Sequence, residues 1–153
     1  GEEDVTLISQ DSMLSAFDDI LRILTLAVAG IAAISLVVAG ILIMNVTWIA
    51  VSQRTAEIGL LKAIGATAAQ VRLLFLGEAA LLALVGALTG LALGETLLWL
   101  GRQATGLPFY APWWARLGAV LLAFATAVLF AWLPASQAAK LQPVMALRPP
   151  GTR

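Results

Sequence analysis

The chain has 153 residues and no formal net charge, and only 12% of its residues are charged while 61% are hydrophobic. This composition excludes an ordinary soluble domain and indicates a membrane protein. Because the chain contains no histidine and no cysteine, it excludes disulfides, thiolate or imidazole metal sites and histidine-based acid–base catalysis.

The first ten residues are expected to be the end of a preceding extracytoplasmic domain. The chain starts with Gly1 and three acidic residues, without the basic start and short apolar core of a secretory signal. β-Branched side chains in residues 4–8 favour a short strand. We therefore expect residues 1–10 to close a domain that lies before this piece of the protein.

A long helix is predicted next. Ser9 or Asp11 can cap it, and no proline interrupts residues 12–53. At about 1.5 Å per residue such a helix spans roughly 60 Å, about twice the hydrocarbon thickness of a bilayer. Acidic and basic residues occur up to residue 22, and none follow before residue 54. We expect residues 11–22 to form a stalk that continues into a transmembrane helix over residues 23–51.

Apolar residues of the stalk follow alternating steps of three and four. This spacing is typical of a helix that packs lengthwise on a partner helix, although an ordinary buried face explains it equally well. The stalk residues of this seam are Leu14, Phe17, Leu21 and Leu24.

The membrane part of the same helix carries small residues, among them Gly30 and Gly40, which permit close approach of another helix. Near its far end Asn45 is an intramembrane polar residue. It can hydrogen-bond a neighbouring helix, and an interfacial water satisfies it equally well.

A polar segment over residues 52–67 separates the first apolar run from the second. As a helix it places Arg54, Ile58 and Lys62 in one row at i, i+4 and i+8. Arg54 and Glu57 can pair at i, i+3. The apolar residues on the other side are Leu60, Leu61 and Ile64.

A second transmembrane helix is predicted over residues 68–100. Gly65 is placed to end the preceding short helix, and Thr67-Ala-Ala-Gln70 matches a capping box that starts the new one. We expect Glu78 to accept hydrogen bonds from a neighbouring helix. A glycine at every fourth position forms a small-residue ridge for helix packing. This glycine ladder consists of Gly86, Gly90 and Gly94.

The last part of the chain contains one more span. Glycine and proline indicate an extracytoplasmic loop over residues 101–113, followed by a transmembrane helix over residues 114–133. All five tryptophans lie at predicted span ends, as an aromatic belt requires. We expect Pro134 to end the span, with a tail over residues 134–153.

The basic residues set the orientation in the membrane. The polar segment, the start of the second span and the tail hold six lysines and arginines, against three on the other side. By the positive-inside rule the polar segment and the C-terminus are then cytoplasmic. The six are Arg54, Lys62, Arg72, Lys140, Arg148 and Arg153, and the three are Arg22, Arg102 and Arg116.

Several of these segments resemble the membrane module shared by MacB, FtsX and the LolCDE permeases, which are subunits of ABC transporters. Two of the motifs, Ile43-Met-Asn45 and Arg54-Thr-Ala-Glu-Ile-Gly59, look closest to MacB-type permeases. The segments are Ile43-Met-Asn45, Arg54-Thr-Ala-Glu-Ile-Gly59, Lys62-Ala-Ile-Gly-Ala-Thr67, Glu78 with the glycine ladder, and the tail over residues 138–148.

This resemblance implies a four-span permease of the bacterial cytoplasmic (inner) membrane. Spans two to four lie in this chain, and a first span and an extracytoplasmic domain precede it. The polar segment is then a coupling helix that docks on a cytoplasmic ABC ATPase. The implied ATPase-coupling residues are Arg54, Glu57, Ile58, Gly59, Lys62, Ala63, Gly65 and Ala66.

The resemblance also implies a mechanism and partners. Two permease copies form a dimer, and ATP-driven closure of the ATPases moves the outer domains through the stalk, a process called mechanotransmission. ATP and Mg bind the partner ATPase, because the chain contains no Walker A motif. A periplasmic adaptor and an outer-membrane channel are further expected partners, and nucleic acid is not.

Two other interpretations stay open from the residues alone. Glu78 and Glu95 are candidates for an ion-coupled carrier or channel, since a charge at the bilayer centre costs about 2.5–3.5 kcal/mol or more and tends to be functional. Both lie near span ends, which favours a structural role. A membrane enzyme would need a serine or an acidic pair, and no such pair is placed together by spacing. We therefore expect a non-catalytic, all-α membrane protein.

Overall fold

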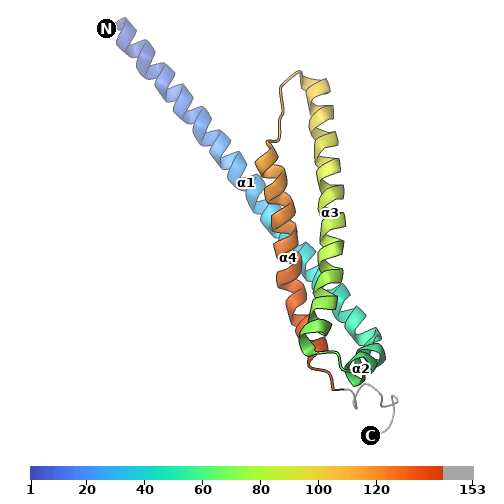
Figure 1. Ribbon diagram of the computed structural model, residues 1–153. Helices are drawn as coiled ribbons and strands as arrows, with labels where there is room; N and C mark the ends of the chain where they lie inside the picture. The colour runs from blue at the N-terminus through green and yellow to red at the C-terminus, as the bar shows by residue number, and fades with distance from the viewer. Residues whose placement is uncertain (143–153) are drawn as a thin grey trace. The chain divides into compact units, whose positions relative to one another are not determined.

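The computed structural model describes residues 1–142. This part of the chain is nearly all helical and contains no strand (Figure 1). Three of its helices are long and apolar enough to cross a membrane, which confirms the expected fold class and number of spans. The helices are α1 (Glu2–Gln53), α2 (Thr55–Ala63), α3 (Ala68–Thr105) and α4 (Trp113–Ala139).

The chain divides into two compact units, and the boundary lies between Val37 and Val38. The first unit is the N-terminal part of α1, which starts at Glu2, so the strand expected over residues 4–8 is wrong. Local β preference is weak, whereas a helix that has formed adds further turns at little cost. Within this first unit the hydroxyl of Ser12 donates to the backbone carbonyl of Ile8, one helical turn earlier, at 2.8 Å.

The stalk seam lies in this first unit, and its apolar side chains are exposed. The exposed fractions are 63% for Leu14, 60% for Phe17, 47% for Leu21 and 57% for Leu24. The lengthwise packing expected of this seam therefore stays a prediction about a partner helix.

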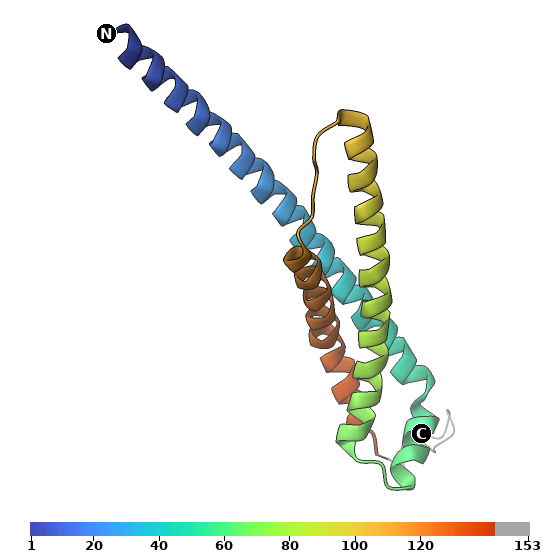
Figure 2. The same ribbon diagram turned by 45° about the horizontal axis from the view of Figure 1, so that its top comes forward.

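The second unit is built on α3 and α4, which run antiparallel and side by side in both views (Figures 1 and 2). Their fully buried residues are mostly alanines, such as Ala79 on α3 and Ala131 on α4. Small side chains let the two backbones approach closely, and this replaces the large apolar core of a soluble bundle. On α4 these alanines recur at every fourth position as Ala127, Ala131, Ala135 and Ala139.

The glycine ladder of α3 lies outside this close contact. A Cβ atom added at Gly86, Gly90 or Gly94 would meet no other residue within 4 Å. Gly90 and Gly94 instead line an open groove of about 350 Å³ between α3 and α4, at the end distant from α2. Helix packing through the ladder is therefore absent from the described chain and stays a prediction about another helix.

Gly40 provides the close helix contact expected of a small residue. A Cβ atom built on Gly40 of α1 would overlap the ring of Phe130 on α4. We expect Gly40→Val to lower the free energy of unfolding by about 1–3 kcal/mol through overpacking. Thermal unfolding of the protein in detergent measures this change.

The matched control is Gly30→Val on the same helix, because a Cβ atom there meets nothing within 4 Å. Both variants introduce the same β-branched residue into α1, so a difference between them isolates the contact with Phe130. Equal loss of stability in the two variants would contradict the prediction.

The ends of the two later spans differ from expectation. α3 continues to Thr105, where Gly106 takes a left-handed conformation with φ of 69° and ends the helix. α4 continues through Pro134 to Ala139. Proline is tolerated inside membrane helices where neighbouring groups satisfy the freed backbone, and here Pro134 is fully buried. The expected tail from residue 143 onward, including Arg148 and Arg153, lies outside the described residues.

Candidate functional site

The short helix α2 is defined at both ends by local backbone structure. α1 ends at Gln53, and Arg54 has φ of −105° and ψ of 22°, which turns the chain before α2 begins. Beyond α2, Gly65 has φ of 104°, a left-handed value that favours glycine. The predicted end of the short helix at Gly65 is thus confirmed.

The predicted capping box after α2 is also present. The backbone N–H of Thr67 donates to Oε1 of Gln70 at 2.9 Å, and the N–H of Gln70 donates to Oγ1 of Thr67 at 3.3 Å. These two bonds satisfy N–H groups that the first turn of α3 would otherwise leave unpaired. The link between α2 and α3 is therefore short and ordered.

Ile58 anchors α2 to the rest of the second unit. Its side chain is 1% exposed and belongs to a buried apolar cluster to which every helix contributes. This cluster, called the junction core below, fixes α2 against the ends of all three long helices. Its members are Val51, Ile58, Val71, Phe75, Ala135 and Ala138.

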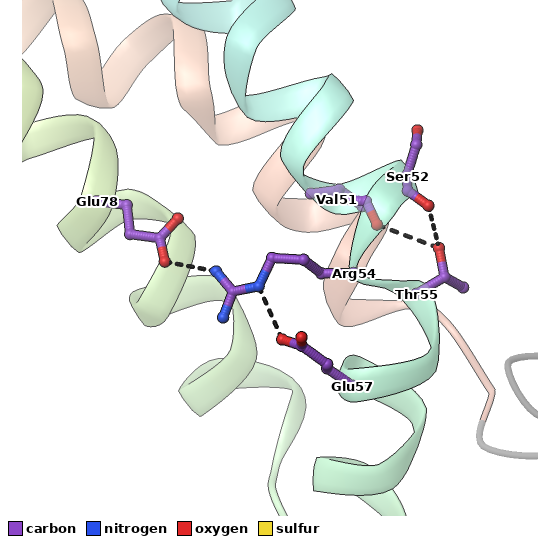
Figure 3. A network of polar contacts seen from close by, with 6 residues as sticks. All are labelled: Val51, Ser52, Arg54, Thr55, Glu57 and Glu78. Carbon is purple, nitrogen blue, oxygen red and sulfur yellow. Dashed lines mark hydrogen bonds and ion pairs between the residues drawn. The ribbon is translucent and has the colours of Figure 1, made fainter.

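Arg54 ties the start of α2 to α3 (Figure 3). Its Nε donates to Oε2 of Glu57 at 2.9 Å, as the i, i+3 spacing predicts, and its Nη1 donates to Oε1 of Glu78 at 2.7 Å. The guanidinium carbon also lies 5.8 Å from the ring centroid of Phe75. The hydrogen bond that Arg54 donates to Glu57, and then the one it donates to Glu78, raise the pKa of Arg54.

The energetic weight of this network is modest. The side chains of Arg54 and Glu78 are 39% and 43% exposed, so solvent screens their attraction. Each ion pair then contributes about 0.2–1 kcal/mol. The network of Arg54 instead fixes where the corner between α1 and α2 lies against α3. Thr55 supports the corner, since its hydroxyl lies 3.1 Å from the Val51 carbonyl and 3.0 Å from that of Ser52 (Figure 3).

Lys62 ties the end of α2 to α4. Its ammonium donates a hydrogen bond to the carbonyl of Ala139, the last residue of α4. The last carbonyls of a helix have no partner within the helix, and a positive charge there also interacts favourably with the helix dipole. Lys62 therefore serves as a cap for α4.

The structure divides the residues that were expected to contact an ATPase. Ile58 and Gly59 are buried within this chain, so both residues lie beneath the surface that a partner can reach. The side chains of Arg54 and Lys62 are bonded inside the chain. The remaining residues are Glu57, Ala63 and Gly65, which are exposed, and Ala66, which packs against the junction core.

The open face of α2 is apolar. Leu60 is 59% exposed and Ile64 is 76% exposed. Leu60 lies on the α2 face opposite to Ile58, and Ile64, four residues later, caps the C-terminal end of α2. Their spacing in the sequence was the signal for this face. This pair, called the α2 ridge below, was not among the expected contact residues.

The other polar residues of the spans lie away from α2. Asn45 is exposed. Glu95 on α3 forms an ion pair with Arg116 on α4, with 2.7 Å between Oε1 and Nε. Within residues 1–142, no group of three or more carboxylate, histidine or cysteine side chains is placed to hold a metal ion.

Comparisons with known proteins agree with these features. The family described as "FtsX-like permease C-terminal" matches residues 29–143. The ABC transporter permease YknZ of Bacillus subtilis is 36% identical over 147 residues, which cover 96% of this chain and 37% of YknZ.

The chain is also similar to larger proteins. The macrolide export ATP-binding/permease protein MacB of Shigella boydii is 41% identical over 155 residues, and that of Escherichia coli K12 is 40% identical. The alignments cover 96% of this chain and 23% of each MacB protein. The chain thus spans between about a quarter and somewhat over a third of the length of these relatives.

Proposed function

The chain belongs to the FtsX-like ABC transporter permease family, with its resemblance to MacB confirmed, and from this premise we propose that it couples ATP hydrolysis by an ABC ATPase to movement of an extracytoplasmic domain. It is a multi-pass membrane protein. The transporter then performs efflux or export by mechanotransmission. α2 is the coupling helix, and ATP and Mg bind the ATPase.

The observation that carries this proposal is the α2 ridge on top of the junction core. Leu60 and Ile64 present apolar side chains to the outside, while Ile58 on the opposite face packs into a cluster shared by all the long helices. A partner that binds the ridge and moves therefore displaces an element already packed on three membrane spans. Leu60 and Ile64 form the main contact, with Glu57 and Ala63 beside them.

The wider assembly is proposed on the same premise. The ATP-binding/permease names of the MacB relatives support an ATPase partner, either fused or separate. Two permease copies, a first span and an extracytoplasmic domain complete the transporter, in the bacterial inner membrane with a cytoplasmic C-terminus. Residues 11–22 form the stalk that joins that domain to the membrane, and a periplasmic adaptor and an outer-membrane channel can receive the exported substrate.

The test replaces both ridge residues by acidic ones in the full transporter. We expect Leu60→Glu with Ile64→Glu to abolish stimulation of ATP hydrolysis by the permease, because two carboxylates would have to be desolvated in an apolar contact. ATPase activity of the reconstituted complex and co-purification of the ATPase measure the effect. Thermal unfolding should change little, since both side chains are exposed in the free chain.

The control for this experiment is Leu107→Glu with Tyr110→Glu. These residues are exposed at 55% and 71% in the link between α3 and α4, outside the spans and outside α2. Loss of coupling in the control but not in the ridge variant would refute the assignment of the contact. Unchanged coupling in both would refute the proposal that α2 docks on the ATPase through this ridge.

A carrier or channel that uses Glu78 and Glu95 has less support. Each carboxylate is paired with an arginine, Glu78 with Arg54 and Glu95 with Arg116. Such pairing accounts for both acidic residues through helix-to-helix contacts. No separate transport role is needed to explain their presence.

A further inference from the structure

We propose that α3 and α4 form a binding site for an anionic phospholipid, with the phosphate at Arg72 and an acyl chain along the groove that ends at Trp132. The two parts of this site are contributed by different helices of the second unit. α3 and α4 lie side by side in both views (Figures 1 and 2). The site is separate from α2 and from the proposed contact with an ATPase.

The acyl part of the site is a shallow groove of about 420 Å³ on α4. Every side chain that lines it is apolar, and the helix is long and apolar enough to span a membrane. Leu129 is 72% exposed and Phe124 is 49% exposed, so the groove is open within this chain. The lining residues are Phe124, Ala125, Val128, Leu129 and Trp132.

The charged part of the site is Arg72 in the second turn of α3. Its guanidinium carbon lies 5.1 Å from the ring centroid of Trp132, the residue at one end of the groove. Such stacking holds the charge in place without neutralising it. Trp132 therefore belongs to both parts and connects the cation to the apolar groove.

Within the described residues Arg72 has no ion pair, as is also true of Arg102 and Lys140, whereas three other cations of this unit have partners. Arg54 is paired with two carboxylates, Arg116 with Glu95, and Lys62 with a backbone carbonyl. Among residues 1–142 no carboxylate pairs with Arg72. A phosphate supplies the missing negative charge, and the guanidinium geometry suits it.

The order of the parts along the membrane normal fits a lipid. Arg72 and Trp132 lie toward the end of the helix pair that carries α2, and tryptophan prefers the headgroup level. From Trp132 the groove runs back eight residues to Phe124, about 12 Å along α4 and away from that end. A lipid headgroup at Arg72 therefore has its acyl chain directed toward the bilayer centre.

The experiment compares two lipids that share acyl chains and differ in headgroup charge. Dioleoylphosphatidylglycerol and dioleoylphosphatidylcholine are titrated separately into the delipidated full transporter, and native mass spectrometry gives the affinity of the first lipid bound. We expect the anionic lipid to bind more tightly. Arg72→Gln should weaken binding of the anionic lipid on the order of fivefold, the effect of one basic residue near a charged membrane surface. It should weaken binding of the zwitterionic lipid less, because the choline ammonium already balances the charge of that lipid's phosphate.

Two further variants separate this site from general attraction. Lys140→Gln removes an exposed cation just beyond α4, so it should leave both affinities unchanged. Val128→Trp fills the groove and should lower the affinity for both lipids. The proposal is overturned if the two lipids bind wild-type protein with equal affinity. It is also overturned if Lys140→Gln lowers the affinity for the anionic lipid as much as Arg72→Gln does. It is also overturned if Leu129→Cys cross-links two copies of the chain in the membrane, because a second copy would then cover the groove.

Discussion

Replacing Ile58 by aspartate will release α2 from the helix ends and lower the free energy of unfolding of the membrane domain by about 3–5 kcal/mol. Ile58 is 1% exposed and lies among side chains from every helix of the described chain. A carboxylate at this position has no cation to pair with in the junction core, whose members are all apolar. The change should appear as a lowered thermal unfolding temperature together with loss of coupling to the ATPase.

The control for Ile58→Asp is Ile64→Asp at the C-cap of the same helix. Ile64 is 76% exposed, so the new carboxylate stays in water in the free chain and the unfolding temperature should be unchanged. Since Ile64 belongs to the α2 ridge, this variant should still weaken coupling. If both variants shifted the unfolding temperature equally, the packing role given to Ile58 would be wrong.

Insertion of two residues after Asp19 should abolish ATP-dependent movement of the outer part of the transporter. α1 is continuous from Glu2 to Gln53, so two additional residues rotate everything before the insertion by about 200° around the helix axis. If the stalk transmits force as a rigid helix, the outer domains of the two copies then no longer meet in register. Spin labels at Gln10→Cys in the two copies would report the loss as an ATP-independent distance.

A seven-residue insertion at the same place is the matched control. Seven residues complete nearly two turns, so the helix keeps its angular phase and lengthens by only about 10 Å. We expect the ATP-dependent distance change to survive in this variant. ATP hydrolysis and ATPase binding should be normal in both, because the insertion lies far from α2 in the sequence. Equal behaviour of the two insertions would argue against rigid transmission.

The sequence predicted the parts of the fold that depend on local chemistry. Apolar runs located three spans, and the turn at Gly65 and the capping box at Thr67 are confirmed. These features depend on residues within one helical turn of each other, so spacing alone identifies them. The pairing of Arg54 with Glu57 is of the same kind.

Features that depend on which helices meet were harder to predict. Both a glycine ladder on α3 and an alanine ladder on α4 offer small residues at every fourth position, and only the alanine ladder is buried here. In a chain this rich in alanine the second ladder does not stand out. The continuation of α4 through Pro134 likewise depends on neighbours that bury the ring.

The candidate site shows the same division. Its location on the short helix followed from charge and glycine spacing, but the choice of the outward face did not. Ile58 and Ile64 are chemically identical, and only the packing against α3 and α4 buries one and exposes the other. Glu78 was expected to meet a neighbouring helix, and its partner Arg54 lies at the corner before α2.

The bond between Lys62 and Ala139 has a mechanical consequence. It joins residues 77 positions apart and so closes a ring of chain that contains the whole α3–α4 hairpin. α2 is attached to both helices of this hairpin at the same end. It is joined to α3 by the short link at residues 64–67 and to α4 by the hydrogen bond of Lys62. A displacement of α2 therefore acts on α3 and α4 together, and the hairpin should move as one rigid unit.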